Sequence, residues 1–309
     1  MTNRFPYGLL SALLKCFLWL APIAPLAVFG GVACTRDLPD PGRFVIVAGG
    51  GMEQPGTEQP GTEQPQQPTP GQPTGSDTNQ PGDRPVEIPD QNFRSWVMWN
   101  YDADKDGILS SAEALSVTRL EFDTKEIASL EGIERFPNLT YLSTSSSRRD
   151  GVNLGLLTEL DLGSNPKLQH IHLIYNNIKT LKLGDHPDLD YLDLDYNEVS
   201  ELDVKGFREL TLLQVSYNNL TRIDVGGLDE LSEFDCDRNP VDTIVLANAK
   251  LESFRCAGTL VRTLDFTKCP KINNVDCTEC PNLTVIKLAK GQVVGNIRKD
   301  DKAKIEYYE

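Results

Sequence analysis

A phrase of about 21 residues recurs along the second half of the chain, and it restricts the possible folds more than any other feature. Leu168, Leu189, Leu210 and Leu231 each open a copy: LQHIHLIYNNIKTLKL, LDYLDLDYNEVSELDV, LTLLQVSYNNLTRIDV and LSEFDCDRNPVDTIVL. The period continues from Leu251, after a one-residue deletion, and from Ile272, while an earlier copy at Leu139 carries about eight extra residues around STSSSRRDGVN. One such unit cannot bury its apolar face alone, so the copies are expected to stack into a solenoid.

Within each copy, the spacing of apolar residues predicts two short extended stretches. The L-x-L pair is expected to form a strand whose alternate side chains point into the core. A second apolar pair follows in each copy, as at Leu181 and Leu183, which leaves little room for a helix on the convex side. An asparagine column is expected to bond the backbone where the chain turns; it contains Asn176, Asn197, Asn218 and Asn239. The predicted fold is a mostly β solenoid with an extended or 3₁₀ outer side.

The pattern L-x-x-L-x-L-x-x-N is the signature of leucine-rich repeats. The segment IASLEGIERFPNLTYL, from Ile127, resembles the internalin-type repeat. The preceding segment IPDQNFRSWVMWNYDADKDGILSSAEALSVTRL is similar to one found before the repeats in many lipid-anchored surface proteins of Gram-negative bacteria. The resemblance covers residues 88–309. It implies a leucine-rich repeat fold and a role as an adhesin or binding protein, with no particular ligand.

The stretch DADKDGILSSAE has the spacing of a 12-residue EF-hand loop. Gly107 occupies the sixth position, where such loops turn sharply. A hard cation needs six to eight oxygen ligands, and acidic side chains at alternate positions supply most of them. The predicted ligands of a Ca²⁺ ion are Asp102, Asp104, Asp106, the carbonyl of Ile108, Ser110 and Glu113.

The loop has a simpler interpretation, as a turn followed by a capping box that starts a helix at Ser110; both can hold at once. Sensor proteins and dockerins carry two such loops, whereas this chain has one. Apolar residues flank the loop and could cover the first coil: Phe93, Trp96, Val97, Tyr101, Leu115, Val117 and Leu120. We therefore predict that residues 91–120 form an N-terminal cap with a structural calcium ion, ahead of repeats at 121–288 and a β cap at 289–309.

The first 33 residues have the layout of a secretion signal, in which Arg4 and Lys15 precede an apolar run. A transmembrane anchor is the alternative, but the run is short and contains two prolines. The residues from Gly31 to Cys34 resemble the lipobox of bacterial lipoproteins, with glycine where the family prefers leucine. This resemblance implies lipid attachment at Cys34 and a place at the bacterial outer membrane or cell surface, with contact to the membrane through the lipid alone.

Residues 34–90 contain a Pro-, Gln-, Gly- and Thr-rich stretch in which EQPGT occurs twice. Because it has almost no apolar residues, it is expected to be an extended, disordered tether. The whole chain has a formal net charge of −15, which argues against nucleic acid as a partner because such a surface repels phosphate backbones.

The residues between the core leucines of each predicted strand should face outward on the concave side, in columns whose members, one from each coil, lie about 4.8 Å apart. Exposed aromatic residues among acids and amides could recognise a glycan or a protein surface. The tyrosines beside the columns could instead stack only on each other as scaffold. The candidate ligand-binding residues are Tyr141, His170, His172, Tyr175, Tyr191, Asp193, Asp195, Tyr196, Gln214, Tyr217, Asp235, Asp237 and Arg255.

His170 and His172 next to Asp193 could hold a transition metal or act as acid and base, which would indicate a metal-dependent hydrolase. No motif places a serine or cysteine nucleophile and no phosphate loop is present, so no enzymatic activity is expected. Three cysteines replace core leucines and are expected to be small buried residues: Cys236, Cys256 and Cys277. Cys269 and Cys280 occupy turns, where a disulfide is possible but not required.

The sequence thus predicts a lipid-anchored surface protein that binds a protein or a glycan through its concave face. The alternative is a structural component of a surface assembly, in which the cap or the acidic face contacts a neighbouring protein.

Overall fold

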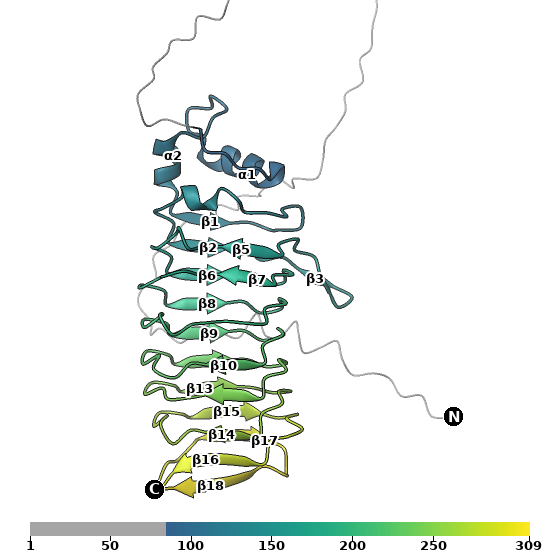
Figure 1. Cartoon of the computed structure of the whole chain (residues 1–309), viewed down its shortest axis with the longest axis vertical. Coiled ribbons are helices and arrows are strands. Elements are labelled where there is room, and N and C mark those ends of the chain that lie inside the picture. Colours follow the sequence, from purple (N-terminus) through teal and green to yellow (C-terminus); the bar gives the residue numbers. More distant parts are fainter. Residues whose placement is uncertain (1–84) are drawn as a thin grey trace, which may run out of the picture. The chain divides into compact units, whose positions relative to one another are not determined.

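A computed structural model describes residues 85–309, which form a stack of coils beneath two short helices (Figure 1). The predicted signal segment, the lipid site at Cys34 and the tether up to residue 84 lie outside the described residues. In residues 85–309 no helix combines the length and apolar composition that crossing a membrane requires.

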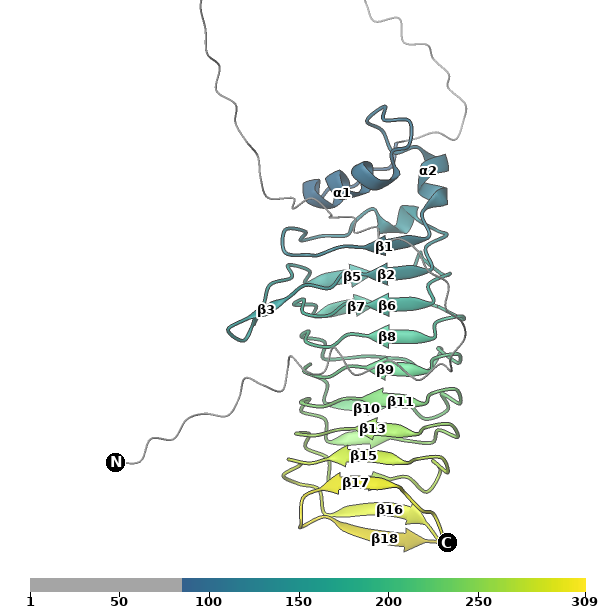
Figure 2. The ribbon, with the colours of Figure 1, turned by 180° about the vertical axis from the view of Figure 1, so that it is seen from behind.

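One long parallel sheet runs the length of the solenoid, and we call it the main sheet (Figures 1 and 2). Its strands, in spatial order, are β1 (Arg119–Glu121), β2 (Tyr141–Ser143), β6 (His170–His172), β8 (Tyr191–Asp193), β9 (Leu212–Gln214), β11 (Glu233–Asp235), β13 (Ser253–Arg255), β15 (Asn274–Cys277) and β17 (Asn296–Lys299). Tyr141 pairs with His170, and His170 with Tyr191, so each coil adds one strand in register. The strand register on which the predicted columns depend is therefore confirmed.

The opposite side of the solenoid carries short parallel sheets rather than helices. They consist of β5 (Glu159–Asp161) with β7 (Thr180–Lys182), β10 (Arg222–Asp224) with β12 (Thr243–Val245), and β14 (Thr263–Asp265) with β16 (Val285–Ala289) and β18 (Lys304–Tyr308). A 3₁₀ turn, η2 (Ile133–Arg135), lies in the first coil. The expectation of an extended outer side with little helix is confirmed.

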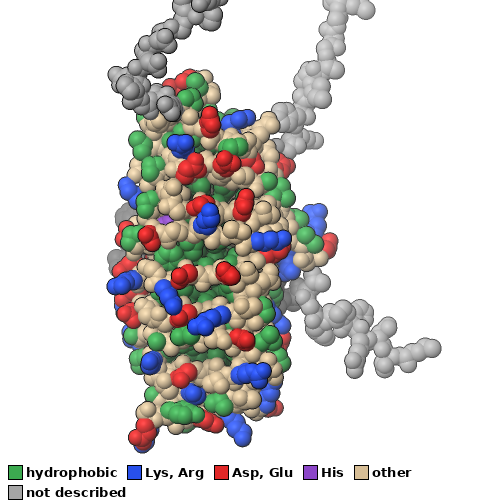
Figure 3. Space-filling view, viewed as in Figure 1, with side chains coloured by type: hydrophobic (Ala, Val, Ile, Leu, Met, Phe, Trp, Pro, Cys, Tyr) green, Lys and Arg blue, Asp and Glu red, His purple; other side chains and the backbone are tan. Residues whose placement is uncertain are grey.

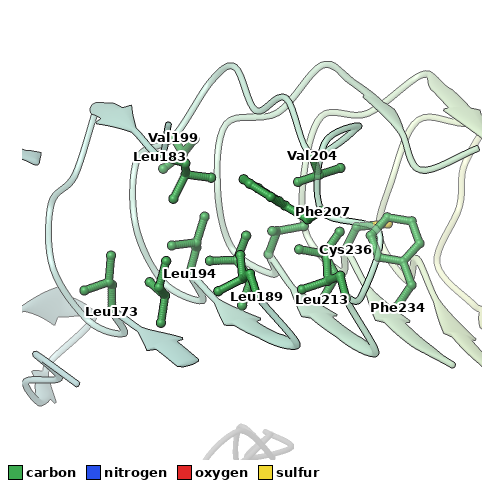
Figure 4. Packing of buried hydrophobic residues seen from close by; sticks show 14 of the residues in the cluster. Leu173, Leu183, Leu189, Leu194, Val199, Val204, Phe207, Leu213, Phe234 and Cys236 are labelled. Atoms are coloured by element: carbon green, nitrogen blue, oxygen red, sulfur yellow. The ribbon is translucent and has the colours of Figure 1, made fainter. Parts of the chain in front are cut away.

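Leucine columns fill the space between the two layers. Figure 4 shows Leu173, Leu194 and Leu213 from successive coils pointing into this interior, and all three are at most 1% exposed. Each side chain buried to this extent contributes roughly 1.5–3 kcal/mol. Cys236 and its counterparts at 256 and 277 stand in the same interior, fully buried, as predicted from their replacement of leucine.

The asparagine column closes the turn after each main-sheet strand. The Nδ2 atom of Asn197 donates to the carbonyls of Leu173 (2.6 Å) and Leu194 (3.0 Å), and its Oδ1 atom accepts from the N–H of Ile178 (3.1 Å). Asn218 and Asn239 repeat this pattern one and two coils further on. The predicted bonding of the turn backbone is confirmed, and because one buried side chain satisfies backbone groups in two adjacent coils, the column also links the coils.

Two helices cover the first coil. Helix α1 (Gln91–Tyr101) begins at Asp90, whose Oδ1 atom caps the helix and whose Oδ2 atom accepts from the N–H groups of Ala128 and Ser129 in the coil below. Phe93 and Val97 are fully buried, and the Phe93 ring lies 5.5 Å from that of Phe122. The predicted contacts of the cap with the solenoid are therefore present for these residues.

Helix α2 (Ser111–Ser116) begins with the predicted capping box between Ser110 and Glu113. The expectation that Leu115 helps to cover the first coil is wrong, since it is 51% exposed. The reason is that α2 turns only Ala114 inward. Strand β1 already pairs with β2, so the expected boundary at residue 120 falls inside the main sheet. At the other end, β17 and β18 add one more strand to each layer.

The extra residues of the first copy form a hairpin that projects from the side of the solenoid (Figures 1 and 2). Its strands are β3 (Arg148–Arg149) and β4 (Val152–Asn153), paired antiparallel across Asp150 and Gly151. Both turn residues have positive φ, 51° and 84°, as the tightest hairpin turns require. In Figure 3, basic, acidic and hydrophobic side chains are all visible on this projection.

Candidate functional site

The outer face of the main sheet begins with a row of aromatic side chains. The Cζ atom of Arg119 lies 3.5 Å from the centre of the Tyr141 ring. Tyr141 contacts His170 edge to face, with ring centres 5.8 Å apart, and His170 contacts Tyr191 in the same way at 5.3 Å. The Nδ1 atom of His170 also lies 3.1 Å from Asp190 Oδ1. The row is a continuous, partly exposed aromatic surface that crosses three coils.

Beside this row lie two carboxylates with little compensation. Asp193 ends β8 and is only 5% exposed, and Asp195 follows it along the chain. Burial raises the pKa of Asp193, and the pKa of Asp195 is raised further by burial and by the charges of Asp193 and Asp235. The nearest basic group to Asp193 is His172, whose Nε2 atom lies 3.6 Å from Oδ2. Within residues 85–309, neither aspartate forms an ion pair with lysine or arginine.

Two coils further along, the acidic column meets one arginine. Arg255 places Nε 3.2 Å from Asp235 Oδ2 and Nη2 2.6 Å from Asp237 Oδ2. Ser216 donates through Oγ to Asp235 at 2.5 Å and through its N–H to Asp195 at 2.6 Å. Burial and the neighbouring Asp235 nevertheless raise the pKa of Asp237. Carboxylates therefore outnumber cations along this part of the face.

Most of the predicted face is thus brought together in one strip. Gln214 lies between Asp193 and Asp235 in the same column, as the strand register requires. Such a strip has a cost, because a partly buried carboxylate without a cation destabilises the fold. A positively charged group from a partner would remove this cost.

The three tyrosines beside the strip stack on one another. The ring centres of Tyr175 and Tyr196 are 4.6 Å apart, and those of Tyr196 and Tyr217 are 4.2 Å apart with planes 11° from parallel. The scaffold interpretation of these residues therefore describes a contact that is present. It does not account for the whole ladder, because Tyr217 remains 40% exposed at its end.

The backbone at each tyrosine lies in the left-handed region, with φ between 56° and 57°. The same place in the following coils is taken by Arg238 (φ 58°), Gly258 (φ 73°) and Glu279 (φ 57°). Such a conformation costs an L-residue roughly 1–2 kcal/mol, and glycine adopts it freely. The backbone conformation therefore does not favour tyrosine at these three places.

A hollow of about 370 Å³ lies between the hairpin and the tyrosine ladder, and the sequence analysis missed it. Its walls include Arg148 and Val152 from the hairpin, Tyr196 and Tyr217 from the ladder, and Arg238. The Cζ atom of Arg148 lies 5.0 Å from the centre of the Tyr196 ring. Asp-Gly between two short polar and apolar runs is a hairpin signal, and it could have revealed the projection.

The histidine pair does not form a metal centre in this structure. In the described part of the chain, the only group of three or more possible ligand side chains with atoms within 4.8 Å of one another is Asp102, Asp104 and Asp106. His170 and His172 instead contact aromatic rings and the aspartates Asp190 and Asp193. This geometry gives no support to the hypothesis of a metal-dependent hydrolase at the two histidines.

The EF-hand-like loop has the internal bonds of a folded cation loop. Gly107 donates to Asp102 Oδ2 (3.1 Å), and Ile108 donates to Asp106 Oδ1 (2.7 Å). Glu113 accepts from the N–H of Ala103 (2.6 Å), while its other oxygen accepts from the N–H and hydroxyl of Ser110 (both 2.9 Å). Of the six predicted ligand residues, the three aspartates have carboxylate oxygens within 4.8 Å of one another. Glu113 instead takes part in the capping box of α2.

These residues suit a divalent cation. The Oδ1 atom of Asp102 is buried and has no hydrogen-bond partner within residues 85–309, although it faces two further carboxylates. A buried carboxylate oxygen is stable when it is bonded or coordinated to a metal. Calcium favours oxygen ligands of this kind, with a glutamate that can supply two more.

The five cysteines of the described part are buried thiols. No disulfide joins Cys269 to Cys280, which were the possible pair. The Sγ atom of Cys280 instead lies 3.2 Å from the carbonyl oxygen of Cys256 and 3.5 Å from Thr259 Oγ1. Burial raises the pKa of the Cys236, Cys256, Cys269 and Cys277 thiols, in keeping with a packing role.

The stacked coils, the register of 20 or 21 residues and the asparagine column define a leucine-rich repeat solenoid. No protein-family model matches the sequence, and no curated protein matches it. Several solved structures are similar to it in fold.

One is the functional domain of InlJ from Listeria monocytogenes, which includes a cysteine ladder; it is 20% identical, with a TM-score of 0.38, over 71% of this chain and 66% of that one. The leucine-rich repeat domain of APL1B is 21% identical, with a TM-score of 0.40, over 50% of this chain and 45% of that one. The LRIM1/APL1C complex is 18% identical, with a TM-score of 0.43, over 58% of this chain and 40% of that one. The chain therefore spans less than two thirds of each of these structures.

Proposed function

We propose that the chain is a lipid-anchored surface protein that binds a protein or glycan through the outer face of the main sheet. The observation that carries this proposal is the pair of carboxylates without a lysine or arginine partner, Asp193 and Asp195, beside the row of Tyr141, His170 and Tyr191. Side chains that weaken a fold but stay on one face are typical of recognition sites. Aromatic residues at such a face supply contact area at a small cost in conformational entropy.

The charge of this face favours a basic protein surface as the ligand. A lysine or arginine placed near Asp193 and Asp195 would replace a repulsive pair of charges by an attractive one. The flanking aromatic row would cover the aliphatic part of such a side chain, as in cation–π contacts. A neutral glycan would use the aromatic row but would leave the carboxylates uncompensated, so it gains less from the site.

Binding can be tested with paired variants of the full chain. Asp193→Asn with Asp195→Asn should abolish capture of a basic partner, whereas Asp185→Asn with Asp188→Asn removes the same charge from exposed positions and should not. Candidate ligands come from pull-down experiments with surface extracts and from glycan arrays. Equal binding by both double variants would contradict the proposal for this face.

We further propose that a structural calcium ion occupies the loop of residues 102–113 and strengthens the cap. The support is the fit of Asp102, Asp104 and Asp106 described above, with Glu113 close by. A single loop outside the cell would bind in the range of roughly 0.1–1 mM, at which calcium is a constant component rather than a signal.

The anchoring proposal rests on sequence alone: the run before Cys34 and its resemblance to a lipobox. It places the protein at the bacterial outer membrane or cell surface. Metabolic labelling with a fatty acid analogue tests it, and Cys34→Ser should remove the label. Protease treatment of intact cells would then distinguish an outward-facing protein from a periplasmic one.

A structural role in a surface assembly is the second candidate. It is favoured by Trp99, which is 89% exposed on the cap, where it could contact a neighbouring subunit. Loss of co-purifying surface proteins from Trp99→Ser, with no loss from the double variant at Asp193 and Asp195, would favour this candidate over ligand binding.

A further inference from the structure

We infer that the hollow between the hairpin and the tyrosine ladder binds an acidic sugar residue through its carboxylate. This inference rests on the proposed function only in treating the solenoid as a ligand-binding module. The site is separate from the face of the main sheet. Its ligand is acidic, whereas the ligand proposed for that face is basic. The hollow is bounded by Arg148, Val152, Tyr196, Tyr217 and Arg238.

The first step is the charge at the hollow. In a chain with a net charge of −15, two arginines, Arg148 and Arg238, contribute to the walls of this one hollow. Arg148 donates to the carbonyl of Gly151 (3.0 Å) and forms no ion pair in the described part of the chain. Arg238 pairs with Glu279, but that pair is exposed and contributes little to stability, so a ligand can compete for the arginine. The wall also contains one acid, Glu198, whose exposed pair with Lys179 at 3.4 Å offsets its charge only in part.

The second step is the supply of hydrogen-bond donors. Burial and the adjacent Tyr217 raise the pKa of Tyr196, so its hydroxyl, which also contacts Tyr217, stays protonated. Guanidinium groups bind carboxylates with two parallel hydrogen bonds. A carboxylate in the hollow would therefore meet donors from both walls. A basic ligand would be repelled by the two arginines, and a neutral one would form weaker bonds because they lack the assistance of a second charge.

The third step is the shape of the hollow. Asn153 holds the hairpin against the ladder, because its Nδ2 atom donates to the carbonyls of Asn176 (2.5 Å) and Tyr196 (2.7 Å). Val152 and Tyr217 present apolar surface on facing walls and are 62% and 40% exposed. About 370 Å³ between them accepts one ring-sized group. A protein partner needs roughly 800 Å² of contact on each side, for which this hollow is too small.

The left-handed backbone at Tyr196 and Tyr217 also supports a binding role for these side chains. Glycine would relieve the strain at Tyr196 and Tyr217, as it does at Gly258. Both tyrosines line the hollow, which gives their side chains a function that stacking alone does not require. A uronic acid combines the needed properties, because its pyranose ring has an apolar face and its carboxylate matches the arginines.

The test is calorimetric titration of the full chain at physiological salt with trigalacturonate, its methyl ester and hexaglutamate. Trigalacturonate should bind, and the ester should bind about tenfold or more weakly, since a charge-assisted hydrogen bond is lost. Arg148→Gln should weaken binding by a similar factor. Arg149→Gln is the matched control, because Arg149 lies next in the same strand, is exposed and does not line the hollow.

Four results would overturn the inference: no binding of trigalacturonate up to about 10 mM, equal binding of the ester, equal loss in the Arg149 variant, or equally tight binding of hexaglutamate, which would indicate an acidic peptide. An unchanged melting temperature of Arg148→Gln shows that the loss is not a folding defect. The double variant at Asp193 and Asp195 should keep its affinity for the saccharide, so this site can fail or succeed independently of the face of the main sheet.

Discussion

The backbone N–H of Asp195 donates a 2.9 Å hydrogen bond to the Oδ1 atom of Asp193. This bond holds the carboxylate of Asp193 against the backbone of Asp195. Two carboxylates therefore lie close together at the end of β8. The repeat does not require this repulsion, because the next coil has the uncharged residues Gln214 and Ser216 at the same positions.

Replacing Asp195 by asparagine should stabilise the protein at neutral pH. Its pKa in the folded state is raised above the ordinary 3.8, so its ionisation favours unfolding. The contribution of the aspartate to stability is therefore full below pH 3.8 and is lost as the pH rises through the folded pKa. An asparagine oxygen can still accept from the N–H of Ser216. We expect a gain of about 1 kcal/mol, or a rise in melting temperature of about 2–4 °C, at pH 7.

The gain should shrink toward zero at acidic pH, where both side chains are neutral. Asp188→Asn removes the same charge from an exposed position and should leave the melting temperature almost unchanged. A destabilised Asp195→Asn at pH 7 would show that the carboxylate has a structural partner which the geometry does not reveal.

His186 should make stability depend on pH in the opposite direction. It is 1% exposed and stacks on Phe207 at 6.0 Å, and burial lowers its pKa from 6.5, partly offset by the carbonyls of Leu183 and Asn165. Protonation therefore favours the unfolded chain. Its contribution is full above pH 6.5 and falls as the pH drops toward the folded pKa.

Denaturant unfolding between pH 8 and pH 5 measures this loss. His186→Asn should remove most of it, because Asn165 and Asn248 occupy the same place in other coils and each donates to two carbonyls. His170→Gln keeps His186 and serves as the control. A wild-type curve that is flat between pH 7 and pH 5.5 would contradict the prediction.

The repeated parts of the structure were predictable from the sequence because each coil solves the same packing problem. Leucine spacing gave the register, and the turn asparagines bond as expected, as at Asn197. The buried state of Cys236 followed from its place in a leucine column. In a solenoid each unit contacts only its neighbours, so local patterns determine most contacts.

The less regular parts were not predictable in the same way. Arg148, Tyr196 and Arg238 are far apart in the sequence and meet only because the hairpin folds back along the ladder. The left-handed backbone at Tyr196 has no signal in the residue type, since tyrosine rarely adopts it. The outward position of Leu115 depends on the length of α2, and helix ends are poorly specified by sequence.

Asn197→Ala should destabilise the solenoid strongly. The change removes four hydrogen bonds and leaves the buried carbonyl of Leu173 and the N–H of Ile178 without these partners. Each unsatisfied buried group costs about 1–3 kcal/mol, so we expect a loss of about 2–4 kcal/mol. Asn219→Ala is the control, because its exposed side chain makes one 3.4 Å bond; its effect should stay within about 0.5 kcal/mol. Similar losses in both variants, measured by denaturant unfolding, would contradict a special role of the column.

Removal of calcium should loosen the cap first. With a dissociation constant of roughly 0.1–1 mM, 10 mM Ca²⁺ would stabilise the fold by about 1.4–2.7 kcal/mol, so EGTA should lower the melting temperature by about 3–10 °C. Hydrogen exchange should rise in residues 91–140, because Asp90 and Phe93 connect the loop's helix to the first coil.

Asp104→Ala should make the protein insensitive to EGTA, since it removes one of the three gathered carboxylates. Asp229→Ala removes an exposed acid in a distant coil and should keep the full response. Magnesium at the same concentration should stabilise less, because it binds reluctantly to flexible all-protein sites. A melting curve that EGTA leaves unchanged, in a protein shown to be calcium-loaded beforehand, would mean that α1 and the capping box hold the cap without the ion.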